Sequence, residues 1–422
     1  MQKEDLPHPY WRFSEYLGPF YSWKWLIAII IAALAIWIAE PWKENLSQVL
    51  ANSIFIGSSY VLLAIGLTLV YRILKFANFA HAEFVTFGMY MAFLAFAVSS
   101  SLGLDIGGDI LWGILIAFIL TGLLGIASDK AVFGQLRERE ADAMTIMISS
   151  IGVGLIIRHI IQEVWTSQSV WYEARLPEWI PGIILPRRTG TYDYMILDME
   201  VRQTAEFSYA YDFHLHFLTP ISDLTTLTID KITLTPIQIF VILCSMLFVL
   251  AAHFLFTRTK LGKAMRATSD NPDLAQAAGI DTRRVILLVW FIGAGLAGAG
   301  GVLSIAHTGR ITPYTGFGLL LIAFAVVILG GIGSFYGAVI AAYIMGFAEN
   351  FGVMLLEGMG RKYSWLSRFL DDLGFPLRLT EVLPLTFDYG YKPAISFVIL
   401  VVVLIFRPRG IMGLPEEAGK DE

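Results

Sequence analysis

A small set of ionisable, amide and glycine residues lies inside otherwise apolar runs of this sequence. Ionisable side chains are costly in lipid, so each one there is a candidate for function, and glycines can mark helix breaks at ligand sites. Opposite charges beside a path through lipid could briefly contact both charged groups of a zwitterion. The candidates for a translocation path or gate are Asn78, His81, Glu83, Arg158, Glu349, Asn350, Gly298 and Gly301.

Arg158 and Glu349 are expected at similar depth, in the outer parts of the fifth and ninth apolar runs. We therefore predict that they pair across a helical bundle, where they could contact the two charged groups of a zwitterionic solute. The alternative is structural. The two residues could form a buried ion pair without solute contact, or Arg158 could extend its head group to the membrane surface.

The stretch N-F-A-H-A-E-F at 78–84 opens the third apolar run, near its inner end. Asn78 is predicted to cap the helix, and Glu83 in the early turns favours its positive end. Gating at the inner mouth is the alternative role for Asn78, His81 and Glu83.

Two glycine-rich stretches have structural explanations. In the seventh run, Ala294, Gly298 and Gly301 share one face, which favours close helix packing, with pore lining as the alternative. The run G-G-I-G-S at 330–334 is predicted to be a tight turn between two spans, with direct solute contact as the alternative.

The composition indicates an integral membrane protein. Of 422 residues, 56% are hydrophobic and only 15% are charged, and the mean hydropathy is +0.65. The net charge of -5 is spread over loops and tails, so the chain lacks the basic field that nucleic-acid binding needs. The single cysteine, Cys244, excludes an intramolecular disulfide and a cysteine-clustered metal site. His214 and His216 are spaced for one side of a strand, and we assign no metal to them.

The apolar runs predict a helical bundle. About 20 apolar residues cross the roughly 30 Å hydrocarbon layer as a helix, and the alternation of a membrane β-barrel is absent. We predict an all-α, polytopic protein of about ten spans, with one transmembrane domain over 1–413 and a polar tail at 414–422. The predicted spans are 24–39, 46–70, 84–98, 110–127, 143–161, 236–256, 285–306, 317–329, 335–356 and 391–406.

Lys and Arg in the short connections predict the orientation. With the N-terminus inside, the short outer connections contain only Lys43 and Arg310, so both termini are predicted to be cytoplasmic. Two longer outer segments, 164–235 and 357–390, are predicted to fold over the outer face. The inner basic residues are Arg72, Lys75, Lys130, Arg137, Arg139, Arg258, Lys260, Lys263, Arg266, Arg283, Arg284, Arg407 and Arg409.

Motifs for enzymatic chemistry are missing from the sequence. There is no G-x-x-x-x-G-K-[ST], H-E-x-x-H or G-x-S-x-G, and no pair of carboxylates at helical spacing inside a span. We therefore predict no catalytic residues and no cofactor on this chain. If ATP drives its function, a partner must bind it.

The polar loop at 257–284 contains a predicted short helix. Asn271-Pro272 is typical of a helix start, and Asp273 adds favourable charge in the first turn. A helix over 274–278 would end at Gly279 in the left-handed conformation. Its small side chains could seat closely in a partner's groove, and a solvated connector is the alternative. The proposed contact residues are Asn271, Pro272, Asp273, Leu274, Ala275, Ala277, Ala278, Gly279 and Ile280.

Several stretches together resemble the permease subunits of branched-chain amino acid (Leu/Ile/Val-type) ABC importers, most closely their first-permease branch. They occur in the same order as in that family. Besides the loop L-G-K-A-M-R-A-T-S-D-N-P-D-L-A-Q-A-A-G-I-D at 261–281, they are G-S-S-Y-V-L-L-A-I-G-L-T-L-V-Y at 57–71, N-F-A-H-A-E-F at 78–84, T-I-M-I-S-S-I-G-V-G-L at 145–155, G-G-I-G-S-F-Y-G-A at 330–338 and R-P-R-G-I-M-G at 407–413.

The resemblance implies a permease in a prokaryotic plasma membrane that moves branched-chain or other hydrophobic amino acids by alternating access. It implies two ABC ATPase subunits that carry ATP and Mg²⁺, a second permease subunit in a heterodimer, and an extracytoplasmic solute-binding protein. In such importers an Ala-rich helix of the permease sits in a cleft of the ATPase, which gives the 271–280 stretch a coupling role.

The sequence is also compatible with other functions. The predicted N-terminal span and the two outer segments depart from the usual family pattern, and related permeases are associated with urea and short amides. A channel or ion-coupled carrier that works alone is a further alternative, although acidic and histidine residues are scarce in mid-span apart from Glu349. A membrane-embedded enzyme is disfavoured because the catalytic motifs are missing.

Overall fold

The computed structural model describes residues 46–101, 109–172, 191–193, 197–205, 208–216, 228–306, 308–372, 392–406 and 410–412. Two compact units divide the chain, and the larger one comprises residues 47–351 and 390–422. The first predicted span at 24–39 and the polar tail at 414–422 lie outside the described residues.

Each of the other nine predicted spans coincides with a helix. Within the described residues, seven helices are long and apolar enough to cross a membrane, and two apolar helices are shorter. The chain is thus a polytopic helical membrane protein, and the total of ten spans stays a prediction. The helices are α2 (Leu46–Leu74), α3 (His81–Ser101), α4 (Asp109–Ser128), α6 (Ala143–Trp165), α8 (Pro236–Arg258), α11 (Thr282–Ile305), α12 (Thr315–Gly330), α13 (Phe335–Asp372) and α15 (Lys392–Phe406).

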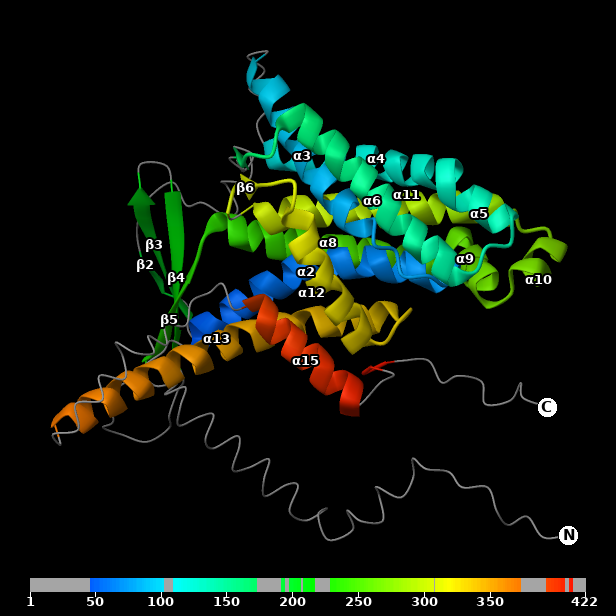
Figure 1. Cartoon of the computed structure of the whole chain (residues 1–422). Helices are drawn as coiled ribbons and strands as arrows, with labels where there is room; N and C mark the ends of the chain where they lie inside the picture. The colour runs from blue at the N-terminus through cyan, green and yellow to red at the C-terminus, as the bar shows by residue number, and fades with distance from the viewer. Residues whose placement is uncertain are drawn as a thin grey trace, which may run out of the picture. The chain divides into compact units, whose positions relative to one another are not determined.

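The centre of the bundle is α11, which packs against α3 and α4 (Figure 1). Glycine allows these helices to approach closely. A Cβ atom on Gly88 of α3 would lie 2.3 Å from the Cα of Gly298, and one on Gly301 would lie 2.7 Å from the carbonyl oxygen of Val85. Gly298 and Gly301 therefore lie at helix contacts, in agreement with the packing interpretation of this face.

The entry to the third span, before His81, is buried inside the bundle. After α2 ends, residues 75–80 are not helical, and Phe76 is only 2% exposed. The backbone N–H of Phe79 donates to Ser150 Oγ at 3.0 Å, inside α6. Irregular backbone is tolerated at this depth when protein groups satisfy it. The expectation that His81 and Glu83 lie near the inner face stays a prediction.

Glycine turns and side-chain caps set the ends of other helices. Gly331 and Gly333 have φ of 100° and 82° between α12 and α13, which confirms the predicted tight turn at 330–334. Asp142 caps α6 and accepts from the backbone N–H of Thr145 at 3.2 Å. Hydrogen bonds from the side chain and backbone of Thr145 lower the pKa of the Asp142 carboxyl.

The segment 164–235 contains β-structure that the all-α prediction did not include. Four strands form an antiparallel sheet in the order β2-β3-β4-β5, and two short strands, β1 and β6, pair with each other. The alternating sequence S-Y-A-Y-D-F-H-L-H forms β4, which confirms the strand spacing of His214 and His216. The strands are β1 (Val170–Trp171), β2 (Thr191–Asp193), β3 (Leu197–Ala205), β4 (Ser208–His216), β5 (Thr228–Leu234) and β6 (Arg310–Ile311).

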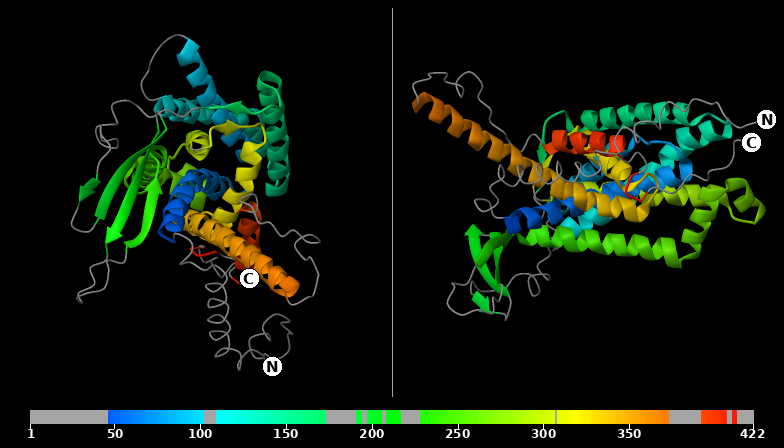
Figure 2. Two further views of the ribbon diagram at one scale, coloured as in Figure 1. Left: turned by 90° about the vertical axis from the view of Figure 1, so that its left-hand side faces the viewer. Right: turned by 90° about the horizontal axis from the view of Figure 1, so that it is seen from below.

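The sheet and the loop helices lie at opposite ends of α8 (Figures 1 and 2). Strand β5 leads into α8 through Thr235, whose side chain and that of Gln238 form a capping box. Two helices follow the other end of α8, namely α9 (Lys260–Asp270) and α10 (Pro272–Ala277).

Two further helical segments were not predicted. A turn of π-helix, η1 (Asp129–Phe133), and a short helix, α5 (Gly134–Glu138), continue from α4. Helix α13 continues to Asp372, so the first part of the predicted outer segment 357–390 is helical, and residues 373–390 lie outside the described part of the chain.

The glycine contacts lead to a stability prediction. We expect Gly88→Val to lower the melting temperature of the purified protein, because the new side chain meets the backbone of α11. Overpacking of this kind typically costs about 1–3 kcal/mol. Gly152→Val in α6 is the matched control, since a Cβ there meets nothing within 4 Å. Equal melting temperatures for the two variants would contradict the close approach.

Candidate functional site

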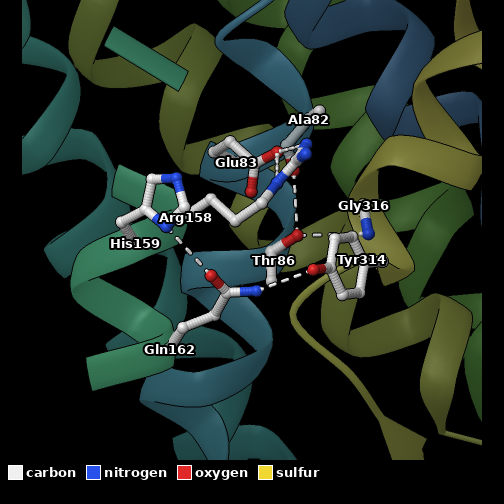
Figure 3. A network of polar contacts seen from close by, with 8 residues as sticks. All are labelled: Ala82, Glu83, Thr86, Arg158, His159, Gln162, Tyr314 and Gly316. Atoms are coloured by element: carbon white, nitrogen blue, oxygen red, sulfur yellow. Dashed lines mark hydrogen bonds and ion pairs between the residues drawn. The ribbon is translucent and has the colours of Figure 1, made fainter. Parts of the chain in front are cut away.

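The charged centre of the bundle is an ion pair between α3 and α6 (Figure 3). Nε of Arg158 donates to Oε1 of Glu83 at 2.9 Å, and Nη2 donates to the same oxygen. The Glu83 side chain is 1% exposed and that of Arg158 is 16% exposed. The predicted pairing of Arg158 with Glu349 is therefore wrong. Because α3 starts inside the bundle, Glu83 is at the depth of Arg158.

Aromatic rings from the start of α12 cover the arginine. The guanidinium carbon of Arg158 lies 5.4 Å from the ring centre of Tyr314 and 5.3 Å from that of Phe317. These distances suit cation–π attraction. The Tyr314 hydroxyl also accepts a hydrogen bond from Nε2 of Gln162 at 3.0 Å. The ion pair and the rings thus join α3, α6 and α12 (Figure 3).

A glycine lets α12 start directly against α3. The backbone N–H of Gly316 donates to Thr86 Oγ1 at 3.1 Å, and the Thr86 hydroxyl donates to the carbonyl of Ala82 at 3.2 Å. A Cβ atom on Gly316 would lie 2.0 Å from that same carbonyl oxygen. A larger residue at 316 would therefore displace the start of α12 from the arginine.

Next to the ion pair, polar atoms are buried with hydrogen-bonding capacity to spare. His81 Nε2–H donates to the carbonyl of Leu63 in α2 at 3.0 Å, and Asn78 Oδ1 accepts from the N–H of Ala80 at 3.1 Å. Within the described residues, Asn78 Nδ2, His81 Nδ1 and Glu83 Oε2 have no hydrogen-bond partner. Such groups could bind water or a polar solute.

The predicted capping role of Asn78 is wrong in detail. The helix begins at His81, and Asn78 holds the turn before it by bonding two residues ahead. Its side chain thus organises the buried entry to α3, without reaching the free N–H groups of the first helical turn.

A second polar cluster surrounds Glu349 in α13. Its Oε2 accepts from the Tyr60 hydroxyl in α2 at 2.9 Å, and its Oε1 accepts from the Ser396 hydroxyl in α15. Asn350 donates to the carbonyl of Gly346 at 2.9 Å and to Ser53 Oγ at 3.4 Å. Glu349 thus accepts hydrogen bonds from two hydroxyls, and these contacts are separate from those of Arg158.

Helix α2 connects the two clusters. Tyr60 bonds Glu349, and the carbonyl of Leu63, one turn further along α2, accepts from His81. Further polar residues complete both clusters, and we did not identify them from the sequence because hydroxyl groups were not considered and Gln162 lies just past the predicted span 143–161. They are Tyr60, Thr86, Gln162, Tyr314 and Ser396.

The loop helix forms much as predicted. Asn271 Oδ1 accepts from the N–H of Leu274 at 2.9 Å, Pro272 is the first helical residue, and Gly279 has a φ of 85°. The N–H of Ile280 donates to the carbonyl of Ala275 at 3.0 Å, which closes the C-terminal end. The helix begins two residues before the predicted Leu274 and ends at Ala277.

Most of α10 is exposed to solvent, and only Ala275 is buried. Leu274 is 68% exposed, whereas Ala275 is 4% exposed and packs inward. A cavity of about 890 Å³ runs beside this helix, with Pro272, Gln276 and Arg283 among its lining residues. The residues Asn271, Pro272, Asp273, Ala277, Ala278 and Gly279 are exposed as well.

A polytopic helical bundle with buried polar clusters and an exposed helix between two spans has the features expected of a membrane permease. The chain belongs to the family described as branched-chain amino acid transport system permease component, which matches residues 49–405.

Two relatives support this assignment over most of their length. The high-affinity branched-chain amino acid transport system permease protein BraD of Pseudomonas aeruginosa is 27% identical, over 87% of this chain and 96% of the relative. The corresponding protein LivH of Escherichia coli is 28% identical over the same shares. The D-allose transport system permease protein AlsC of E. coli is 34% identical, over 28% of this chain and 37% of its own. No solved structure matches.

The ion pair leads to a prediction about stability. We expect Arg158→Met to cost about 3–5 kcal/mol, because it leaves the Glu83 carboxylate buried without its partner. The double variant with Glu83→Gln should recover most of this loss, as measured by thermal unfolding of the purified protein. Glu163→Gln, at an exposed position of α6, is the control. A double variant as unstable as the sum of the singles would contradict the pairing.

Proposed function

We propose that this chain is the membrane-spanning subunit of an ATP-driven ABC importer for branched-chain and other hydrophobic amino acids. The observation that carries the proposal is the family match over 49–405, together with relatives of that printed function of which 96% is covered. The sugar permease AlsC covers only 28% of the chain, so it favours the general class and not a sugar substrate. No observation favours urea or a short amide.

The proposal includes several partners. Two ATPase subunits would bind ATP and Mg²⁺, because the sequence lacks a phosphate-binding loop of its own. A second permease subunit would complete the path, and a solute-binding protein would deliver the amino acid at the outer side. We place α10 at the cytoplasmic side, where the ATPase docks, and the sheet β2–β5 at the extracytoplasmic side.

Two connections would transmit movement from α10 into the bundle. Helix α9 is attached to the end of α2, because the Ser269 hydroxyl donates to the carbonyl of Arg72 at 3.0 Å. After α10, the chain turns at Gly279 into α11, where Asp281 caps the helix by accepting from the N–H of Arg284 at 3.0 Å. A displacement of α10 on ATP binding would thus reach both α2 and α11.

Close packing would let α11 pass a displacement on to the helices around it. Its glycines contact the backbones of α2, α3 and α4 so closely that it cannot move without them. Movement of α3 relative to α6 would stretch the Glu83–Arg158 pair and uncover the spare polar atoms of His81 and Asn78. In alternating access these groups would contact the solute only transiently, because tight binding would slow release.

The exposed face of α10 should be the ATPase contact. We expect Ala277→Trp to reduce co-purification of the ATPase by about tenfold, since its bulk prevents close seating and tenfold corresponds to about 1.4 kcal/mol. Ala251→Trp, at an exposed position of α8, is the control. If both variants retain the ATPase and full uptake, α10 is a connector.

Reconstitution should identify the energy source and the solute class. In proteoliposomes that contain the complete transporter and its binding protein, we expect uptake of labelled leucine to require ATP hydrolysis and to be unaffected by excess urea or acetamide. Uptake by this chain alone without ATP would refute the proposal and favour a channel or ion-coupled carrier.

A further inference from the structure

A separate cavity of about 270 Å³ lies between α2, α8, α9 and the start of α13. Apolar side chains such as Leu69, Met265 and Phe335 form most of its wall. The charged residues of the lining are two arginines, and no acidic residue lines the cavity. The polar residues that matter for its chemistry are Thr68, Arg72, His253, Arg266 and Tyr336.

Neither arginine has a carboxylate partner within the described part of the chain. Arg72 forms no ion pair or side-chain hydrogen bond there, and Arg266 donates only to the backbone carbonyl of Phe256. Thr68 is 3% exposed, and its hydroxyl has no hydrogen-bond partner among the described residues. Two cations and a spare hydroxyl on one apolar cavity are complementary to an anion with an apolar body.

The neighbouring surface of α8 suits acyl chains. Leu243, Leu247, Leu250 and Phe254 are 48%, 66%, 56% and 63% exposed. Their spacing places them on one face of the helix, as expected of side chains that face lipid. The last residue of this stripe, Phe254, lies one turn before Thr257, which lines the cavity. The Tyr336 hydroxyl, bonded to His253 Nδ1 at 2.8 Å, gives the rim an interfacial aromatic residue.

We propose that this cavity binds the phosphate headgroup of an anionic phospholipid, with Arg72 and Arg266 as its charged contacts and Thr68 as a hydrogen-bonding group. The acyl chains lie along the exposed stripe of α8. Because Arg266 is on α9, which precedes α10, and Arg72 is at the end of α2, the bound headgroup joins α9 to α2. The site is independent of which solute the protein transports.

Native mass spectrometry of the full-length protein tests the site directly. The protein is delipidated and titrated with phosphatidylglycerol or phosphatidylcholine. Basic residues near a membrane surface typically contribute about 1 kcal/mol each toward anionic lipid, which is about fivefold in affinity. We therefore expect Arg72→Gln and Arg266→Gln each to weaken phosphatidylglycerol binding by about fivefold, with little change for phosphatidylcholine.

Controls separate charge, folding and the source of the anion. Arg258→Gln changes an exposed arginine at the end of α8 that does not line the cavity, and it should bind like the wild type. Arg72→Lys keeps the charge and should retain most of the binding even if the glutamine variants fold poorly. Equal phosphatidylglycerol binding by Arg72→Gln, Arg266→Gln and Arg258→Gln would overturn the proposal. Displacement of the lipid by millimolar inorganic phosphate would also overturn it, because the site would then recognise a free anion.

Discussion

Close contact between helix backbones at glycine is the constraint on which this structure depends. In lipid, apolar side chains gain little by leaving their surroundings, so association relies on dispersion contacts and on internal hydrogen bonds. Helix α11 is buried along its glycine-rich half, from Gly293 to Val302, because its neighbours approach its main chain. The polar groups of the bundle keep their partners only because this packing holds α2, α3 and α4 at fixed distances.

The charged residues of the bundle lie among these closely packed helices. The Glu83 carboxylate and the Arg158 guanidinium neutralise one another, and the aromatic rings of Tyr314 and Phe317 cover the cation. Glu349 accepts from the hydroxyls of Tyr60 and Ser396, so its hydrogen bonds link α13 to α2 and α15. The two carboxylates thus connect different sets of helices, since Glu83 joins α3 to α6 and Glu349 joins α13 to α2 and α15.

Local signals predicted more of this protein than long-range ones. Apolar length alone located nine helices, and the Asn-Pro start and Gly279 end of α10 followed from propensities that act within a few residues. The partner of Arg158 could not be predicted in the same way. It depends on where α3 begins, which is set by a contact between Phe79 and a distant helix. The β-sheet within 164–235 was missed because only its histidine spacing was considered, although the alternation through β4 is regular.

The buried segment before α3 has a consequence for biosynthesis. The N–H of Phe79 donates to the side chain of Ser150, which is 71 residues further along the chain, so α4 and the start of α6 must be synthesised before this bond can form. Until then the N–H of Phe79 has no protein acceptor and is best satisfied by water. The connection between α2 and α3 therefore reaches its final hydrogen bonding only once α6 is in place, which makes α6 the element that completes the N-terminal half of the bundle.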